Sequence, residues 1–357
     1  MKKEKSSSLA SIAKAAGVTP ATVSYALRNK PGVSESTRQR VRRIAEKLGY
    51  NPDSRVAAIM SATRGAANKT LLPVAWLNNH LGEDAWRKYA YLWPYLDGAQ
   101  RRAKELGFRL EEVWTKEPGM TAKRLSTILY SRGIEGVIVT QYLRHLRLDW
   151  NRFAAVTLHG QLVSPSLPHV TADLSHNLFT AVKKLHRLGY RKIGICLEAT
   201  LKNYAFVTLK PVAKYLAETF APTSRERVPP LFYPWGWGTD KRRDDGVEVI
   251  AWIKKYRPDA IVCHSSMLLG WIERAGFSVP GEIALVHLAT DDDVSDWAGI
   301  DSHRRTIGGI AVEQVVARVQ HRQFGLPAVS QDTLVRGEWH GGWTVAKGAK
   351  DRRLNIK

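Results

Sequence analysis

The chain has 357 residues, of which 44% are hydrophobic, and a net charge of +21 from 54 Lys and Arg against 33 Asp and Glu. This composition is that of a globular protein with two or three domains and excludes a largely disordered chain. No apolar run reaches about 18 residues, so no transmembrane helix is expected, and residues 1–8 lack the apolar segment of a secretory signal. The basic excess favours a polyanionic partner, either nucleic acid or an anionic membrane surface, and we expect a cytoplasmic protein.

Motifs for catalysis and metal binding are missing from the sequence. There is no Walker P-loop, GxSxG elbow, HExxH motif or paired-cysteine zinc spacing. Cys196 and Cys263 each lie inside an apolar run, which predicts two buried, reduced thiols. The acidic run at residues 291–293 is more typical of a solvated turn than of a metal site. We therefore expect neither an enzyme nor a bound cofactor or metal.

Three short helices are predicted in the first 50 residues. The first and third carry the apolar stripe of an amphipathic helix, at i, i+3, i+4 and i+7: Leu9, Ile12, Ala13 and Ala16, and then Val41, Ile44, Ala45 and Leu48. Gly17 supplies a turn before the second helix, which Thr19 can cap with Pro20 at its first position. Residues 1–65 carry 13 basic and 4 acidic side chains. The pattern predicts a helix-turn-helix that binds DNA, although any small three-helix domain shows such stripes.

The second helix is the one available to enter a major groove. Its outward residues Pro20, Ala21 and Tyr25 are placed to touch base edges. Because none of them is Arg, Asn or Gln, direct readout would rest on apolar contacts, such as those with thymine methyls, and on the tyrosine hydroxyl. Hydroxyl, amide and basic side chains around the helix ends are expected to contact phosphates: Thr22, Ser24, Arg28, Asn29, Ser34, Thr37 and Arg38.

The local motifs of residues 8–52 are more specific than their spacing. They include IA..AGV in the first helix, the triplet Thr22-Val23-Ser24, the pattern VS..TR..V over residues 33–41 and LGY.P over residues 48–52. With these motifs the segment resembles the N-terminal domain of LacI/GalR transcriptional regulators. The resemblance implies a homodimer that binds the two halves of a pseudo-palindromic operator and acts as a repressor.

The resemblance continues into residues 53–65, where the family has a hinge that forms a short helix on operator DNA. It implies that Val56, Ile59 and Met60 enter the minor groove, with Ile59 as a wedge between base pairs. A segment this short is not stable as an isolated helix, so coupling its folding to DNA binding is physically reasonable. From the residues alone, the alternative is a linker helix that packs on the body through Val56 and Ile59.

From residue 66 to residue 345, short apolar runs alternate with helical patterns. Strands are predicted at residues 72–77, 109–114, 136–140, 154–158, 192–197, 260–264 and 283–288, and helices at residues 96–106, 122–131, 175–188, 245–255 and 267–274. This alternation predicts an α/β fold with parallel sheets, in which ligands bind beyond the carboxyl ends of the strands.

Several fragments of this body resemble the effector domain of the same family, a periplasmic-binding-protein type I fold of two Rossmann-like lobes. They include GAQRRAKELGF at residues 98–108, VTADLSHNLFTAVKKLHRLGYRKIGI at residues 170–195 and GFSVPGEIALV at residues 276–286. The resemblance implies a small-molecule effector in the cleft between the lobes. It also implies three passages of the chain between them, near residues 162–170, 293–300 and 324–329.

Departures from the family pattern put a carbohydrate effector in doubt. Ser265 and Ser266 stand where sugar-binding relatives usually carry an Asn-Asp pair, and Ala289 and Thr290 stand where they usually carry aspartates. Polar and aromatic side chains at strand ends and in the following loops are the candidates for the cleft: Asn78, Asn79, Gln141, Tyr204, Trp237, His264 and Asp291.

The expected organisation is a helix-turn-helix domain at residues 1–50, a hinge at 51–65, a two-lobed effector-binding and dimerisation domain at 66–345 and a basic tail at 346–357 without a coiled-coil repeat. The expected function is that of a DNA-binding transcriptional regulator at the nucleoid, whose affinity for its operator a small molecule modulates. Two alternatives are a sensor or receptor of periplasmic-binding-protein type whose head serves another partner, and an enzyme with an appended DNA-binding head. The missing catalytic motifs count against the second.

Overall fold

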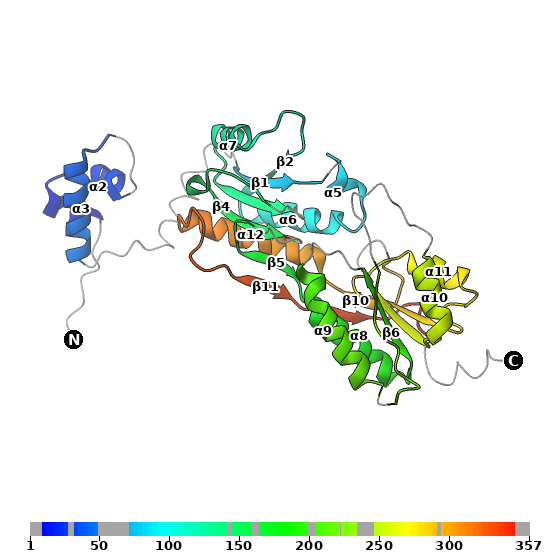
Figure 1. Cartoon of the computed structure of the whole chain (residues 1–357). Helices are drawn as coiled ribbons and strands as arrows, with labels where there is room; N and C mark the ends of the chain where they lie inside the picture. The colour runs from blue at the N-terminus through cyan, green and yellow to red at the C-terminus, as the bar shows by residue number, and fades with distance from the viewer. Residues whose placement is uncertain are drawn as a thin grey trace, which may run out of the picture. The chain divides into compact units, whose positions relative to one another are not determined.

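The computed structural model describes residues 9–27, 32–48, 71–80, 82–140, 145–158, 164–198, 204–221, 223–233, 246–290 and 294–346. It divides into two compact units, Met1–Thr70 and Leu71–Lys357, which we call the head and the body (Figure 1). In the part of the chain described, no helix is long and apolar enough to cross a membrane. The predicted hinge, with Val56, Ile59 and Met60, lies outside the described residues.

The head contains the three expected helices, α1 (Leu9–Ala16), α2 (Pro20–Leu27) and α3 (Glu35–Lys47). Their apolar stripes meet in one small core of buried residues: Ile12, Ala13, Ala16, Val23, Ala26, Val41 and Ala45. Gly17 has a φ of +63°, which lets the chain turn sharply from α1 into α2. Leu48 departs from the expectation, because it lies beyond the end of α3 and is 44% exposed.

The first lobe of the body is built on a parallel six-stranded sheet of order β11-β5-β4-β3-β1-β2. Its strands are β1 (Leu72–Asn78), β2 (Phe108–Trp114), β3 (Gly136–Thr140), β4 (Ala154–Leu158), β5 (His169–Ala172) and β11 (Asp332–Val335). Helices α6 (Trp93–Glu105) and α12 (Arg304–Gln320) cover one face, and α7 (Ala122–Ser131) covers the other. The short helices α5 (Ala85–Lys88) and η1 (Trp150–Arg152) lie in connections.

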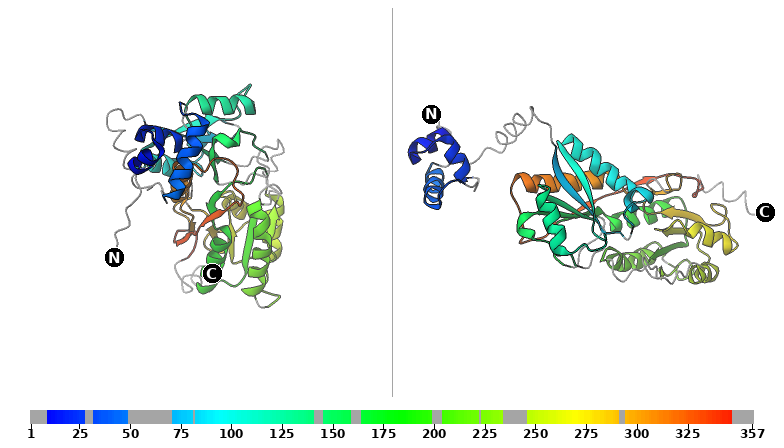
Figure 2. Two further views of the ribbon diagram at one scale, coloured as in Figure 1. Left: turned by 90° about the vertical axis from the view of Figure 1, so that its left-hand side faces the viewer. Right: turned by 90° about the horizontal axis from the view of Figure 1, so that it is seen from above.

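The second lobe repeats this plan with the order β12-β10-β9-β8-β6-β7. Its strands are β6 (Ile193–Glu198), β7 (Leu231–Tyr233), β8 (Ala260–Cys263), β9 (Ala284–His287), β10 (Gly299–Asp301) and the antiparallel β12 (Glu338–His340). Helices α8 (Leu174–Arg187) and α9 (Tyr204–Thr219) cover one face, and α10 (Val247–Tyr256) and α11 (Leu268–Arg274) cover the other (Figure 2). Cys196 and Cys263, in register on β6 and β8, are buried free thiols as predicted.

The predicted two-lobed α/β fold is confirmed. All seven predicted strands agree with β1–β4, β6, β8 and β9 to within one residue at each end. The sequence interpretation missed five short strands, β5, β7, β10, β11 and β12, and it also missed α5, α9 and α12. In α12 the stripe of buried residues includes Arg304 and Gly308, neither of which has an apolar side chain, so no clear amphipathic pattern was visible in the sequence.

The predicted passages between the lobes were too early in the chain. Three passages exist, but they follow β5, β10 and β11 and therefore lie near residues 172–174, 301–304 and 335–338. Each of these three strands still belongs to the lobe that the chain is about to leave. Because these strands were not recognised, the ends of the lobes were placed several residues too soon.

Helices α6 and α12 pack with their backbones in direct contact. A Cβ at Gly98 would overlap the carbonyl oxygen of Arg305, and a Cβ at Gly308 would overlap that of Tyr95. At its other end, α12 places Val319 against Gly136 at the start of β3. We expect α6 and α12 to move as one body, because no side chain separates their backbones at these two glycines.

Candidate nucleic-acid interface and ligand cavity

Helix α2 presents an uncharged surface at its N-terminal end. Thr19 Oγ1 accepts a hydrogen bond from the backbone N of Thr22 at 3.1 Å and so caps the helix. Pro20 and Ala21 are exposed, and Tyr25 is 47% exposed. Val23 and Ala26 on the opposite side are buried in the head core, so the predicted base-reading residues share one outward face.

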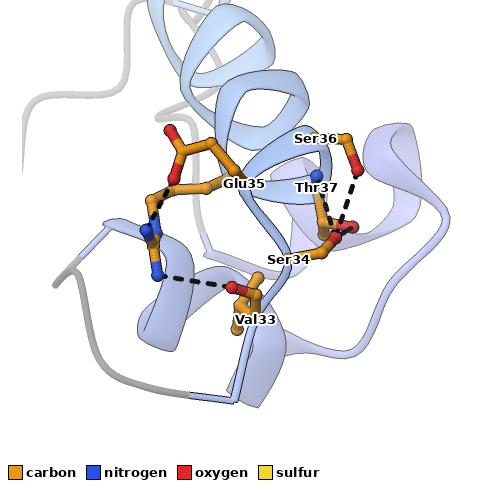
Figure 3. Close-up of polar contacts among 6 residues, drawn as sticks. Val33, Ser34, Glu35, Ser36 and Thr37 are labelled. Carbon is orange, nitrogen blue, oxygen red and sulfur yellow. Dashed lines mark hydrogen bonds and ion pairs between the residues drawn. The ribbon is translucent and has the colours of Figure 1, made fainter.

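Hydroxyl groups gather at the N-terminus of α3 (Figure 3). Ser34 Oγ accepts from the backbone N of Thr37 at 3.4 Å and donates to Thr37 Oγ1 at 2.9 Å. Ser36 Oγ lies 3.2 Å from Ser34 Oγ. Hydroxyls and backbone amides at a helix N-terminus suit a phosphate group. Ser36 was not among the predicted residues, although its place in the first turn after a capping serine could have suggested it.

Contacts at both Nη atoms hold Arg38 inside the head. Its Nη1 donates to Glu35 Oε2 at 2.7 Å, and its Nη2 donates to the carbonyl oxygen of Val33 at 3.3 Å. Only 19% of its side chain is exposed. Thr22 and Ser24 are half-buried on α2, while Arg28 and Asn29 lie outside the described residues. Phosphate contacts by these side chains stay predictions.

In the first lobe, the predicted cleft residues Asn78 and Asn79 have their amide groups engaged by the protein. Asn78 Nδ2 donates to the carbonyl oxygen of Glu83 at 2.7 Å, and Asn79 Nδ2 donates to that of Thr140 at 2.5 Å. Thr115 Oγ1 donates to Asn79 Oδ1 at 2.6 Å. Both asparagines are buried, and they connect the loops that follow β1 and β2 with the end of β3.

In the second lobe, Glu198 lies at the end of β6 and is nearly buried. Burial raises the pKa of this carboxyl to about 7. The nearby hydroxyls of Ser265 and Tyr233 have the opposite, smaller effect and lower this pKa. The predicted cleft residue His264 stacks on His287, with ring centroids 5.7 Å apart. Gln141, Trp237, Asp291 and the side chain of Tyr204 lie outside the described residues.

A cavity of about 340 Å³ lies where the chain passes from β10 of the second lobe into α12 of the first. Its described lining comes from the ends of β10 and β12, the loops after β9 and the first turn of α12: Thr290, Ser295, Asp301, His303, Arg304, Arg305, Thr306 and His340. Asn78, Asn79 and His264 are not among these residues. The sequence interpretation missed this lining because it recognised neither the short strands nor the start of α12.

Two family models match separate parts of the chain. Residues 8–53 match the model described as "Bacterial regulatory proteins, lacI family", and residues 182–338 match a "Periplasmic binding protein-like domain". A curated relative is the HTH-type transcriptional regulator MalR of Streptococcus pneumoniae, which is 23% identical over 186 residues, 51% of this chain and 54% of MalR. The chain thus spans about half the length of this relative.

Solved structures share the fold of the whole chain. The transcriptional regulator CelR in complex with cellobiose matches with a TM-score of 0.59 and 18% identity over 95% of this chain and 99% of CelR. The lac repressor dimer bound to operator and the anti-inducer ONPF matches with a TM-score of 0.53 and 19% identity over 96% of this chain and 100% of the repressor. The chain therefore combines a head that matches the lacI-family model of bacterial regulatory proteins with a body that matches a periplasmic-binding-protein-like domain, and it shares the fold of these two regulators.

Proposed function

We propose that the chain is a homodimeric repressor that binds a pseudo-palindromic operator and responds to a small molecule in the cavity between its lobes. The observation that carries the DNA-binding part is the exposed, uncharged face of α2 beside the hydroxyl cluster of α3. The match of residues 8–53 to the lacI-family model of bacterial regulatory proteins also supports DNA binding by the head. The protein would act in the cytoplasm, at the nucleoid.

The composition of α2 explains why two heads are needed. Pro20 and Ala21 can make only apolar contacts with base edges, and Tyr25 adds a single hydroxyl. One head therefore discriminates weakly among sequences, whereas two heads on one duplex add their preferences and fix the spacing of the half-sites. The predicted wedge Ile59 would add selectivity for steps that kink easily. Phosphate contacts would supply much of the affinity and make it fall with salt.

Helix α12 connects the cavity with the part of the body that contains β1, the first strand after the head. Its 17 residues span about 25 Å. Arg304 at its first position lines the cavity, while Val315 and Val319 near its last position contact Gly136, which pairs with Val74 of β1. A ligand that binds one lobe arrangement more tightly would shift α12, and the start of β1 with it, and so bias the hinge segment.

Selection of duplexes from a random pool by the full chain tests this function. The expected result is enrichment of one sequence with two inverted half-sites. A variant without residues 1–60 should lose this enrichment and still fold, since the body is a compact unit of its own. Equal enrichment by the truncated variant would overturn the assignment of the head.

A further inference from the structure

The three passages of the chain between the lobes meet at one place in the body. The carbonyl oxygen of Val335, at the end of β11, accepts a hydrogen bond of 2.8 Å from the backbone N of Asp173 in the first passage. Gly337 packs on the end of β10, since a Cβ there would lie 2.4 Å from Ile300 Cγ2 and 2.6 Å from the carbonyl oxygen of Asp301. Because these passages join the lobes, a change in the angle between the lobes has to be taken up here.

One side chain of the second lobe reaches into this meeting point. Asn177 is the fourth residue of α8, just after the first passage, and is fully buried. Its Oδ1 accepts a hydrogen bond of 2.9 Å from the backbone N of Gly337, which is 160 residues further along the chain. The same Oδ1 would lie 2.9 Å from a Cβ of residue 337, so a side chain there would crowd this contact. Asn177 thus fastens the helix after the first passage to the third passage.

The buried amide of Asn177 is only half used. Its Nδ2 has no hydrogen-bond partner among the described residues. The contact of Asn177 with the third passage therefore rests on a single hydrogen bond between neutral groups. Such a bond shifts an equilibrium between two arrangements by about two- to tenfold. It is strong enough to favour the described arrangement and weak enough for a bound ligand to overcome.

Asn79 in the first lobe shows a buried amide that is used on both sides. Its Nδ2 donates to the carbonyl oxygen of Thr140 at 2.5 Å, and its Oδ1 accepts from Thr115 Oγ1 at 2.6 Å. Turning the side chain of Asn79 would break bonds on both sides, whereas Asn177 is released from Gly337 by breaking one. A side chain that connects two passages and is held by one bond suits a contact that opens and closes.

We propose that Asn177 is a latch between the lobes: its hydrogen bond to Gly337 holds the described arrangement, and the lobes change their angle when this bond opens. Asp301, whose carbonyl oxygen lies beside Gly337, also belongs to the lining of the cavity. A small molecule that prefers the opened arrangement has only to outweigh one hydrogen bond. This regulatory role rests on the proposed function, whereas the latch itself does not.

Distances between spin labels on the two lobes test the latch. Lys123→Cys on α7 and Lys254→Cys on α10 place one label at an exposed site of each lobe. The buried thiols of Cys196 and Cys263 stay unlabelled, which the chain without added cysteines checks. The labelled full chain is mixed with an excess of unlabelled chain, so that pulsed electron paramagnetic resonance measures distances within one chain.

We expect one dominant distance between the labels in the parent protein. In Asn177→Ala a second distance should gain at least about fivefold in its ratio to the first, because the buried N–H of Gly337 loses its acceptor in the described arrangement. If Asn177→Ala does not fold, Asn177→Leu takes its place, since leucine fills a similar space without an acceptor. An unchanged distribution of distances would overturn the proposal.

Two further variants separate the latch from a general loosening of the second lobe. Leu178, the next residue of α8, is equally buried but packs in the core of that lobe, so Leu178→Ala should lower stability and leave the distances unchanged. Asn177→Asp keeps an oxygen that accepts from the backbone N of Gly337 and should retain the parent's distances. Equal changes of the distances in Leu178→Ala and Asn177→Ala, or in Asn177→Asp and Asn177→Ala, would contradict the latch.

Affinity for the selected duplex separates the latch from its regulatory role. If Asn177→Ala changes both the distances and the DNA affinity, the latch and its role stand. If it changes the distances but not the affinity, the latch stands and its regulatory role fails. A change in affinity with unchanged distances would overturn the latch and leave the DNA-binding function in place.

Discussion

Helices α2 and α12 both place their N-terminal ends at a proposed binding site, but they are built in opposite ways. The start of α2 is capped by Thr19 and carries no charge, whereas α12 begins with Arg304 and Arg305 and has no side-chain cap. A capped, neutral helix end is stable by itself and contributes little affinity, which fits a surface that reads sequence together with a second head. The end of α12 lines the cavity in which we propose that the small molecule binds, so its side chains are placed to respond to an occupant.

The largest effect should come from separating α6 and α12. Gly98→Val would drive its side chain into the backbone of Arg305, so we expect about 3 kcal/mol of lost stability in the body. Gly309→Ala is the control on the same helix, because the nearest atom to its Cβ would be Arg102 Cβ at an ordinary 3.6 Å. Thermal unfolding measures both. A body equally stable in both variants would show that the close contact is unimportant.

The second prediction concerns Glu198, whose carboxyl has a pKa raised by burial to about 7 from an ordinary 4.5. In that interval the folded protein keeps the proton while the unfolded chain releases it, so stability falls as pH rises from about 4.5 to about 7. At pH 8 the penalty approaches about 3 kcal/mol, and Glu198→Gln should remove it. Melting temperatures at pH 5 and pH 8 test this. If the melting temperature gained by Glu198→Gln over the parent protein were the same at pH 5 and pH 8, this account would be contradicted.

A smaller effect is expected at the DNA-reading surface. Tyr25→Ala should change base preference at one or two positions of each half-site, at a cost of about 1–2 kcal/mol on the preferred sequence. Ser36→Ala should weaken all sequences alike, because phosphate contacts carry no base information. Binding of a panel of duplexes with single changes measures both. A uniform loss in the Tyr25 variant would remove its role in base readout.

The smallest effect concerns the cap of α2. Thr19→Ala removes the acceptor for the backbone N of Thr22 and should destabilise the head by about 1 kcal/mol. Thr19→Ser keeps the hydroxyl acceptor, so the stability of the head should be close to that of the parent protein. Helix content of the head on heating, followed by circular dichroism, distinguishes the two variants. Identical melting of both would show that the hydroxyl does not hold the start of α2.

The head could be predicted almost completely from the sequence because its core follows a helical period. Residues such as Ile12, Val23 and Val41 were expected inside and are buried there. Strands such as β3 and β8 were equally clear, since each is a largely apolar, buried run between two layers of helices. Strands β5, β10 and β11 have only three or four residues and take their conformation from the neighbouring strands, which no local pattern reveals.

The cavity was beyond prediction for a related reason. Arg304 reads as a surface residue in the sequence, and its burial follows only from the packing of α12 against α6 and the first sheet. Conversely, Asn78 and Asn79 were expected in the cleft because they follow a strand, yet their amides hold neighbouring loops together. Position after a strand predicts where a side chain lies but not which partner it binds.

The central claim is that two heads read one operator together, and a stoichiometric titration tests it most directly. The full chain is titrated onto the selected duplex and onto the same duplex with one half-site scrambled. We predict two chains per intact duplex and a loss of affinity of at least about 100-fold on the scrambled one, because several mismatches at about 1–3 kcal/mol each accumulate there. Equal affinity for both duplexes, with one chain bound to each, would contradict the account.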